Sequence, residues 1–170
     1  ESVSFLADKF DKIIGIDNNY RAYFFGEGAS VEWNLQRIQD NTPNYIHYST
    51  DIRDYSGLQE IFSTYGNDIS LIIHTAAQPS HDWSGKYPFE DFEINALGAV
   101  ILLEEMRNQC PKAVFIQCSS SKVYGDALNS FDYEEKDHRY ELPSNHTYYN
   151  GFREDMFVDQ SLHSPYGAGK

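Results

Sequence analysis

The sequence predicts an α/β protein whose strands form a parallel sheet. Four short apolar runs alternate with longer segments in which apolar residues recur every three or four positions. Strands separated by helices in this way form strand-helix-strand units with right-handed crossovers. Polar residues follow the runs directly, at the edge of the sheet where open α/β folds bind ligands. The four runs cover residues 12–17, 45–50, 69–74 and 113–116.

The helical segments are recognised by their apolar periodicity. Residues 55–65 and 89–109 carry the clearest pattern, and Pro111 ends the second segment before the last strand. Weaker patterns predict a loop at residues 20–31, a helix at 32–39 and a helical stripe within 1–10. Because that stripe lacks a capping residue, the chain is expected to begin inside an element.

Composition limits the function classes. The 170 residues, 41% of them hydrophobic, suffice for the core of about one domain. The 26 acidic and 13 basic residues give a net charge of −13, which repels nucleic-acid phosphates and anionic membranes. No apolar run approaches the roughly 18 residues that a membrane span needs. We therefore expect neither a nucleic-acid nor a membrane partner.

The cysteines point to a reducing compartment. Cys110 and Cys118 lack the paired spacing of a disulfide framework or a structural metal site. No signal peptide pattern is present. We expect reduced thiols, a cytoplasmic protein and no metal site.

Three kinds of polar side chain are placed for shared chemistry. The apolar run at 113–116 leads into three serines that end at Ser121, as a buried parallel strand ends in a polar loop. Tyr166 and Lys170 stand four residues apart behind a Ser-Pro pair, so a helix beginning there puts them on one face. A hydroxyl, a phenol and an ammonium are predicted to meet in one pocket.

Other strand ends carry candidate binding groups. Asp17 closes the first run, where nucleotide folds hold an adenosine ribose, although an isolated strand-terminal Asp is more often only solvated. Small residues after His74 would let the ring of another molecule approach the backbone, whereas His74 itself is expected to be a core histidine. Residues 127–165 are polar and aromatic, and a segment of this length is more typical of a binding excursion than of a linker.

Taken in order, these motifs resemble the extended short-chain dehydrogenase/reductase family over the whole chain. The motifs are Asp17-Asn18, Asp51-Ile52, His74-Thr75-Ala76-Ala77, Asn95, Ser119-Ser120 before Val123-Tyr124-Gly125-Asp126, and Tyr166 with Lys170. The resemblance implies a Rossmann-type doubly wound parallel sheet that binds NAD. A carboxylate at the position of Asp17 favours NAD over NADP because it repels a ribose phosphate.

The resemblance also assigns roles to residues. The catalytic set would be Ser120, Tyr166 and Lys170, with Lys170 stabilising the Tyr166 phenolate that accepts a proton from a sugar hydroxyl. The cofactor-binding set would be Asp17, Asn18, Arg21, Asp51, Ile52, Ala76, Ala77, Gln78, Asn95, Ser119, Tyr166 and Lys170. Substrate contacts would come from Ser120, Ser121, Lys122 and His81.

Within the family, three strings look most like the CDP-paratose 2-epimerases: GIDNNYRAYFFGEGAS, TAAQPSHDW and SKVYGD. This subgroup oxidises a nucleotide sugar to a keto-sugar and returns the hydride to the opposite face, which would convert CDP-paratose to CDP-tyvelose at carbon 2. The related 4,6-dehydratases place Asp-Glu where Ser121 and Lys122 stand, so dehydration is disfavoured. Epimerisation of a UDP-hexose at carbon 4 and a non-catalytic nucleotide-binding role both stay open.

The family pattern extends beyond these residues on both sides. It begins with a strand and a glycine-rich turn that seats a pyrophosphate on a helix N-terminus, and it ends with a smaller substrate domain. Neither is found in this sequence. Residues 1–170 are therefore expected to be a partial NAD-binding domain, inactive and poorly stable alone, and a homo-oligomer when full length.

Overall fold

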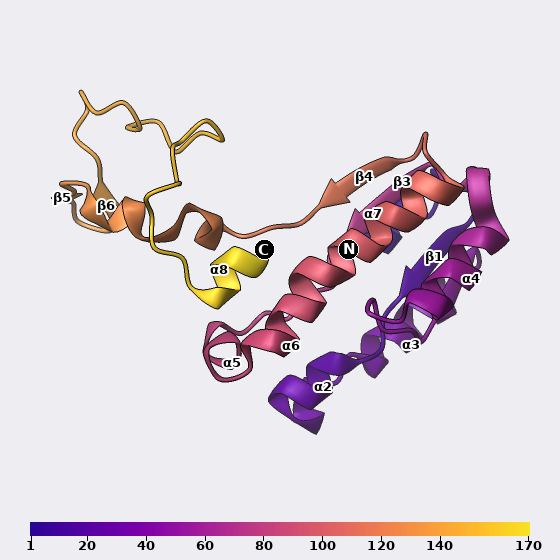
Figure 1. Ribbon diagram of the computed structural model, residues 1–170. Coiled ribbons are helices and arrows are strands. Elements are labelled where there is room, and N and C mark those ends of the chain that lie inside the picture. The colour runs from indigo at the N-terminus through magenta and orange to yellow at the C-terminus, as the bar shows by residue number, and fades with distance from the viewer. The chain divides into compact units, whose positions relative to one another are not determined.

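The computed structural model describes residues 1–170, which divide into two compact units. Unit 1 comprises residues 1–78 and 93–117, and unit 2 comprises residues 79–92 and 118–170. Figure 1 shows the elements of both units along the chain.

Unit 1 alternates helices with strands. In chain order its elements are α1 (Ser2–Leu6), β1 (Ile13–Ile16), α2 (Tyr20–Phe25), the 3-10 turn η1 (Glu27–Ala29), α3 (Glu32–Asn41), β2 (Tyr45–Tyr48), α4 (Tyr55–Tyr65), the 3-10 turn η2 (Gly66–Asp68), β3 (Leu71–His74), the π-helical turn η3 (Glu93–Leu97), α7 (Gly98–Gln109) and β4 (Val114–Gln117). All four predicted strands are present, each within two residues of the predicted bounds.

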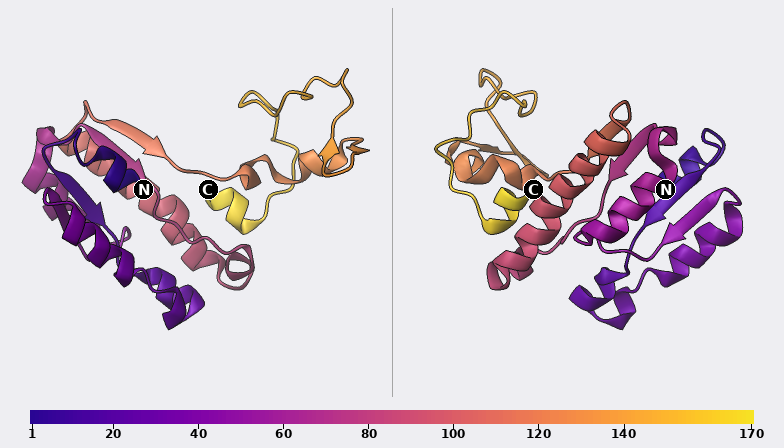
Figure 2. Two further views of the ribbon diagram at one scale, coloured as in Figure 1. Left: turned by 180° about the vertical axis from the view of Figure 1, so that it is seen from behind. Right: turned by 45° about the vertical axis from the view of Figure 1, so that its right-hand side comes forward.

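The strands pair in parallel, as predicted. β1 pairs with β2 from Ile13 opposite Tyr45 onward, and β3 pairs with β4 from Leu71 opposite Val114 onward. Figure 2 shows the strand arrows of unit 1 pointing the same way. Parallel pairs need long crossovers, and here helices supply them. The predicted α/β class with a parallel sheet is confirmed.

The sheet is interrupted between β1 and β3. The two strand pairs share no hydrogen bonds, and a cavity of about 1270 Å³ separates them. Every residue of Ile13–Ile16 and of Leu71–His74 lines this cavity. Successive strand residues point to opposite faces of a sheet, so a cavity that meets all of them runs along the strand edges. The doubly wound sheet is therefore incomplete, with β1 and β3 each presenting an unpaired edge.

The core of unit 1 lies between α4, α7 and the β3–β4 pair. Leu58 and Phe62 of α4 form one buried cluster with Ile101 and Leu102 of α7, which Cys110 and Ala113 complete. The N-terminus of α4 is capped by Asp54, whose carboxylate accepts a hydrogen bond of 3.1 Å from the Gly57 amide. His74 is only 4% exposed, so the prediction of a core histidine is confirmed.

The long helix predicted at 89–109 is not one regular helix. It consists of α6 (Pro88–Phe92), the π-helical turn η3 and α7. A π-helical turn contains an extra residue per turn, which apolar periodicity does not reveal, and such turns are frequent at functional sites. Asn95, one of the predicted cofactor residues, lies in this turn.

The predicted loop at residues 20–31 is wrong in part, because α2 and η1 occupy most of it. Asn19 organises this segment from a left-handed backbone conformation, with φ of 56°. Its amide donates to Ser30 Oγ at 2.9 Å, and its side-chain oxygen accepts from the Val31 amide at 2.9 Å. The aromatic segment that was predicted to be a loop therefore forms a helix. Its Tyr20 and Tyr23 rings stack on each other, with centroids 4.6 Å apart.

Unit 2 holds short elements joined by irregular chain. They are α5 (His81–Lys86), α6 (Pro88–Phe92), the 3-10 segment η4 (Ser121–Ser130), the two-residue strands β5 (Glu134–Glu135) and β6 (Tyr140–Glu141), and α8 (Pro165–Gly169). α8 packs against α5, α6 and η4. Residues 127–165, the predicted excursion, lie wholly in this unit and gather an aromatic cluster in which Phe131 and Phe152 stack at 5.9 Å.

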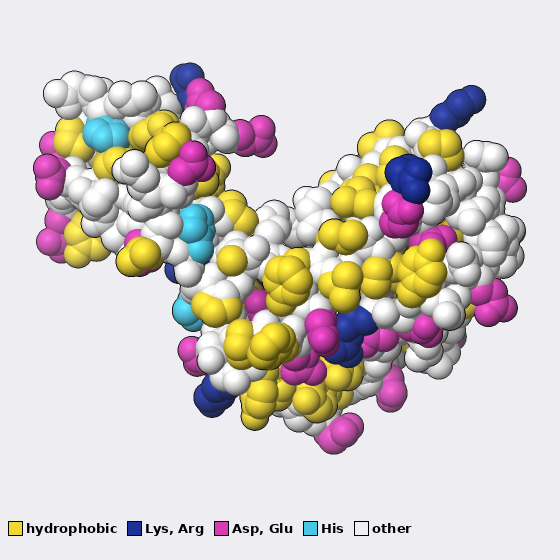
Figure 3. Space-filling view, viewed as in Figure 1, with side chains coloured by type: hydrophobic (Ala, Val, Ile, Leu, Met, Phe, Trp, Pro, Cys, Tyr) yellow, Lys and Arg dark blue, Asp and Glu magenta, His cyan; other side chains and the backbone are white.

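The surface mixes acidic and apolar side chains. Figure 3 shows acidic side chains spread over the face viewed and apolar side chains gathered along α7. Val100 and Leu103 of α7 are 59% and 47% exposed. No helix is both long and apolar enough to traverse a lipid bilayer.

Candidate active site

The predicted tyrosine and lysine lie on one short helix of unit 2. Ser164 caps α8, its hydroxyl accepting a hydrogen bond of 3.2 Å from the Gly167 amide, and Pro165 occupies the first helical turn. Tyr166 lies in the first turn and Lys170 follows the last helical residue. The Lys170 ammonium nitrogen is 5.1 Å from the centroid of the Tyr166 ring. The structure thus brings a cation to the face of the phenol.

The serine loop, residues 119–121, lies beside this helix because α8 packs closely on η4. A methyl group at Gly167 would come within 2.5 Å of the Lys122 carbonyl oxygen, so only glycine permits this approach. The Ser119 hydroxyl donates to the Lys170 carbonyl oxygen at 2.9 Å. The Ser120 hydroxyl caps η4 and accepts from the Lys122 amide at 3.3 Å. The hydroxyl, phenol and ammonium predicted to share a pocket therefore belong to neighbouring elements of one unit.

Two further helices surround Tyr166 and Lys170. From α5, the His81 ring lies 6.0 Å from the Tyr166 ring. From α6, Asp91 is completely buried. Burial lowers the pKa of Lys170 and the negative charge of Asp91 opposes this, with burial the larger effect. The negative charge of Asp91 therefore favours the charged form of Lys170, whereas burial favours the neutral amine.

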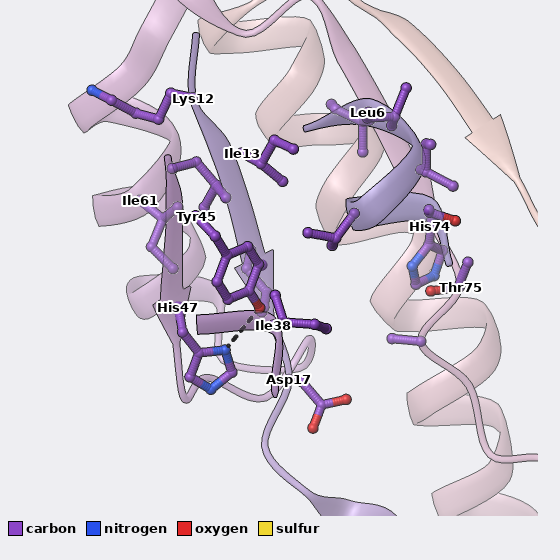
Figure 4. Close-up of a pocket in the computed structure, with 18 of the residues that line it drawn as sticks. Leu6, Lys12, Ile13, Asp17, Ile38, Tyr45, His47, Ile61, His74 and Thr75 are labelled. Carbon is purple, nitrogen blue, oxygen red and sulfur yellow. Dashed lines mark hydrogen bonds between the residues drawn. The ribbon is translucent and has the colours of Figure 1, made fainter. Parts of the chain in front are cut away.

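A second polar cluster lies at the carboxyl ends of β1 and β2 in unit 1. The Asn18 side-chain amide donates to Asp51 Oδ2 at 3.0 Å, and Asp17 Oδ1 accepts from the Asn19 amide at 2.7 Å. Asp17 and Asn18 also line the cavity between β1 and β3. Figure 4 shows Asp17 and Thr75 beyond the ends of these strands, away from Lys12. The predicted ribose-binding carboxylate therefore opens onto this cavity.

Arg53 joins this cluster and was not predicted. Its guanidinium donates two hydrogen bonds to Asp51, of 2.9 and 2.7 Å, and lies over the Tyr20 ring. These bonds lower the pKa of Asp51. The only sequence signal was the spacing of two residues between Asp51 and Arg53 behind a strand. Arg21, which was predicted to bind cofactor, lies over the Phe25 ring of its own helix, and its role in binding stays a prediction.

Most of the remaining cofactor candidates lie in the segment that follows β3 or in η3. Asn95 Oδ1 accepts a hydrogen bond of 2.9 Å from the Gln78 amide, and both residues are buried. Ala76 lines the cavity, as does His74 before it. Ile52 is 8% exposed and packs on Gly98, where a methyl group would come within 2.7 Å of its Cδ1. The Ile52 side chain therefore belongs to the core, and Ile52 also lines the cavity.

The cavity is larger than a ligand site alone requires. Small-molecule pockets usually measure about 300–1,000 Å³, whereas this one has about 1270 Å³ and includes two strand edges. No group of three or more His, Cys, Asp or Glu side chains is arranged to hold a metal ion. Polar groups that could bind a nucleotide, Asp17 and Asn18, therefore lie at one end of the open cavity that runs between the edges of β1 and β3.

Comparison with known proteins identifies relatives of the chain. It is 34% identical over 127 residues to CDP-paratose 2-epimerase of Salmonella typhi, a match that covers 75% of this chain and 35% of that protein. It is 28% identical over 166 residues to UDP-glucuronate 4-epimerase of Thermodesulfobacterium geofontis, covering 98% and 42%. The chain spans less than half the length of these relatives.

Solved structures share the fold. UDP-glucose 4-epimerase from Bifidobacterium longum, in complex with NAD+ and UDP, superposes with a TM-score of 0.63 at 23% identity, covering 98% of this chain and 40% of that one. dTDP-glucose 4,6-dehydratase from Bacillus anthracis, in complex with NAD, gives 0.62 at 23% identity, covering 99% and 42%. These similarities establish the Rossmann-type fold.

A sequence profile of the NAD dependent epimerase/dehydratase family matches residues 3–150. That range takes in both strand pairs, the Asp17 cluster, the buried Asn95 and the serine loop. On this match, over most of its length, the chain belongs to the NAD dependent epimerase/dehydratase family, whose cofactor is NAD.

Proposed function

We propose that the protein containing this chain is an NAD-dependent nucleotide-sugar epimerase that acts through a transient keto-sugar. The observation that carries the proposal is the Lys170 ammonium held 5.1 Å from the Tyr166 ring, beside the Ser119–Ser120 loop. Residues 1–170 are then a partial NAD-binding domain, with residues 127–165 an excursion toward substrate.

Tyr166 is the base in this mechanism. A phenol has a pKa near 10 and is mostly protonated at neutral pH, so it needs a positive neighbour to ionise. Lys170 supplies that charge, and the Tyr166 phenolate accepts the proton of the sugar hydroxyl. Ser120 donates a hydrogen bond to the reacting oxygen, where negative charge develops. When the keto-sugar is reduced from its other face, Tyr166 returns the proton and the centre is inverted.

NAD supplies the hydride acceptor when it is bound. Asp17 and Asn18 would hold its adenosine ribose, because their side chains open onto the cavity at the end of β1. Ala76, Ala77, Gln78 and the buried Asn95 of unit 1 would contact NAD near its nicotinamide end. Ser119, Tyr166 and Lys170 of unit 2 are further proposed cofactor contacts. None of these residues is assigned to the pyrophosphate.

The substrate is proposed to be CDP-paratose, inverted at carbon 2 to give CDP-tyvelose. Support comes from the 34% identity to the Salmonella typhi CDP-paratose 2-epimerase. Ser121, Lys122 and His81 are the proposed substrate contacts. Dehydration is disfavoured because Ser121 and Lys122 offer no carboxylic acid and carboxylate beside Tyr166 to eliminate water.

A second candidate is a UDP-hexose 4-epimerase. It is favoured by relatives such as human UDP-glucose 4-epimerase, which is 31% identical over 112 residues, covering 65% of this chain and 31% of that protein. The same three catalytic residues serve either reaction. A non-catalytic nucleotide-binding protein is the third candidate, and the retained Ser120, Tyr166 and Lys170 argue against it.

The location and assembly belong to the proposal as well. Cys110 and Cys118 are both free thiols, which supports a cytoplasmic protein. The exposed apolar side chains along α7 support a homo-oligomer. Residues 1–170 alone are proposed to be inactive, since the substrate domain of the family lies outside them.

The test assays the full-length protein with NAD and each nucleotide sugar separately. Conversion of CDP-paratose, with Tyr166→Phe reducing kcat by about 10²-fold or more, is the expected result. Tyr149→Phe is the control, because Tyr149 is an exposed tyrosine of the same unit. Conversion of UDP-glucose alone selects the second candidate. Full activity in Tyr166→Phe would contradict the mechanism for both.

A further inference from the structure

Asp91 is a carboxylate inside unit 2 with no role in the mechanism so far. It lies on α6, and its exposed fraction is 0%. Acidic side chains are almost never fully buried unless a positive charge compensates them, because removing a charge from water costs several kcal/mol. α6 packs against α8, the helix that ends beside Lys170. Lys170, which follows the last residue of α8, places a positive charge in this part of the unit.

Lys170 is the cation on which Asp91 acts. Its side chain is half-buried, and its ammonium lies over the Tyr166 ring. Burial lowers the pKa of Lys170, and the negative charge of Asp91 raises it. Without Asp91, burial would act unopposed and favour the neutral amine. A neutral amine cannot stabilise the Tyr166 phenolate.

The other charged and titratable groups around α8 do not offer the same compensation. Asp82 and Lys86 of α5 are both exposed, so water screens their charges. Glu90, also on α6, is partly exposed and accepts a hydrogen bond of 2.7 Å from the Trp83 indole nitrogen. Lys122 of η4 carries the same charge as Lys170 and would repel it. His81 of α5 faces the Tyr166 ring and carries no negative charge. Asp91 is the buried anion among them.

We propose that Asp91 is a positioning residue, which holds the Lys170 ammonium beside Tyr166 and keeps it charged while Tyr166 exchanges a proton with the substrate. This inference rests on the proposed roles of Tyr166 and Lys170. Asp91 is buried beneath α8, so it acts through Lys170 and touches neither substrate nor cofactor. The negative charge of Asp91 favours the charged form of Lys170, and charged Lys170 in turn stabilises the Tyr166 phenolate.

The first test follows the titration of Lys170 by NMR, in full-length protein carrying ¹³C-labelled lysine. Asp91→Asn removes the negative charge with little change in volume, and we expect the acid dissociation constant of Lys170 to rise about tenfold or more. Glu90→Gln is the matched control. It removes one charge from the same helix but still accepts the bond from Trp83, so Lys170 should titrate as in the parent. An unchanged Lys170 titration in Asp91→Asn would overturn the proposal.

A reciprocal variant covers the case in which Asp91→Asn does not fold. Coupling between two sites acts equally in both directions. Lys170→Met removes the positive charge from a half-buried position. We expect the acid dissociation constant of the Asp91 carboxyl to fall in this variant by the same factor by which that of Lys170 rises in Asp91→Asn. An Asp91 resonance that titrates as in the parent would equally overturn the proposal.

A kinetic profile separates this inference from the proposed function. Activity needs charged Lys170, so the rate falls as the pH rises through the pKa of Lys170. In Asp91→Asn the alkaline limb of kcat/KM should move to lower pH, whereas a purely structural defect lowers the whole profile without moving the limb. If the protein converts no nucleotide sugar, the proposed function fails, while the two NMR titrations still decide whether Asp91 and Lys170 are coupled.

Discussion

Ser120 serves two purposes that one substitution would confuse. Its hydroxyl caps η4 by accepting the Lys122 amide at 3.3 Å, and it is also the proposed donor to the reacting sugar oxygen. Removing an N-cap costs about 1 kcal/mol of stability. Removing a hydrogen-bond donor to the oxygen on which negative charge develops lowers kcat. The two contributions are separable because threonine retains a hydroxyl.

We expect Ser120→Ala to lower kcat of the full-length protein by about 10²-fold and to destabilise it slightly. Ser120→Thr should recover most of the rate, since it restores both donor and cap. Ser144→Ala, at an exposed serine of the same unit, is the control for a general loss. Steady-state kinetics and thermal melts give both quantities. Equal rates in Ser120→Ala and the parent would remove Ser120 from the catalytic set.

The Asp51–Arg53 pair makes stability depend on pH. Arg53 lowers the pKa of Asp51 below its ordinary value of 3.8. A carboxyl whose pKa is lower in the folded than in the unfolded state stabilises the fold above the unfolded pKa. That contribution is lost as the pH falls through the folded pKa. Both side chains are about one quarter exposed, so solvent screens the pair and its contribution is modest.

Arg53→Met should lower the unfolding free energy of the full-length protein by about 1 kcal/mol at pH 7. The difference from the parent should shrink as the pH falls below 3.8 toward the lowered pKa of Asp51 in the folded parent, and it should vanish once Asp51 is protonated in both proteins. Arg37→Met is the control, because Arg37 is exposed and bonds only the neutral Asn34. Urea unfolding at a series of pH values measures the difference. A difference that is constant down to pH 2 would show that Asp51 is not its source.

At the scale of elements, the contact of α8 with η4 determines where Tyr166 and Lys170 lie relative to the serine loop. The contact depends on Gly167, where a methyl group would meet the Lys122 backbone oxygen. A backbone atom cannot turn aside as a side chain can, so a larger residue must move the helix.

Gly167→Ala is therefore expected to destabilise the full-length protein by about 1–3 kcal/mol and to lower kcat, since α8 moves away from the loop. Gly85→Ala on α5 is the matched control: nothing lies within 4 Å of the added methyl, and alanine favours a helix. Calorimetry and kinetics together test this. A Gly167→Ala variant as stable and active as Gly85→Ala would show that the close contact does not position the helix.

The elements that the sequence predicted are those whose signal is local. An apolar run such as residues 69–74 identifies a buried strand because few other structures use one, and the Ser-Pro pair identified the start of α8. The π-helical turn at Glu93–Leu97 has no such signal, since it changes the phase of a helix without changing its composition. Arg53 and Asp91 were missed for another reason: their importance lies in partners that only the fold brings near.

At the scale of the whole molecule, the slot between β1 and β3 is the dominant feature. Two parallel strand pairs face each other across it with unpaired edges and apolar residues such as Ile14 and Ile72. Unpaired edges of this kind are sites of aggregation in an isolated chain. In the family pattern a further strand precedes these residues, and we expect it to fill the slot.

Hydrogen exchange tests this expectation. Backbone amides of β1 and β3 should exchange about 10²-fold or more slowly in the full-length protein than in residues 1–170 alone, because a strand in the slot satisfies both edges. The amides of α4 serve as the internal reference, since they are bonded within the helix in either case. Equal protection of β1 and β3 in the two proteins would show that no strand enters.

In the proposed mechanism, one site oxidises and re-reduces the same carbon of a nucleotide sugar, and Tyr166 moves only the hydroxyl proton. The most direct measurement uses CDP-paratose deuterated at carbon 2, with the full-length protein and NAD in ordinary water. Hydride removal and return keep the label, so the CDP-tyvelose formed should retain deuterium at that carbon. Loss of the deuterium to solvent would show that the carbon itself is deprotonated, and would contradict the mechanism.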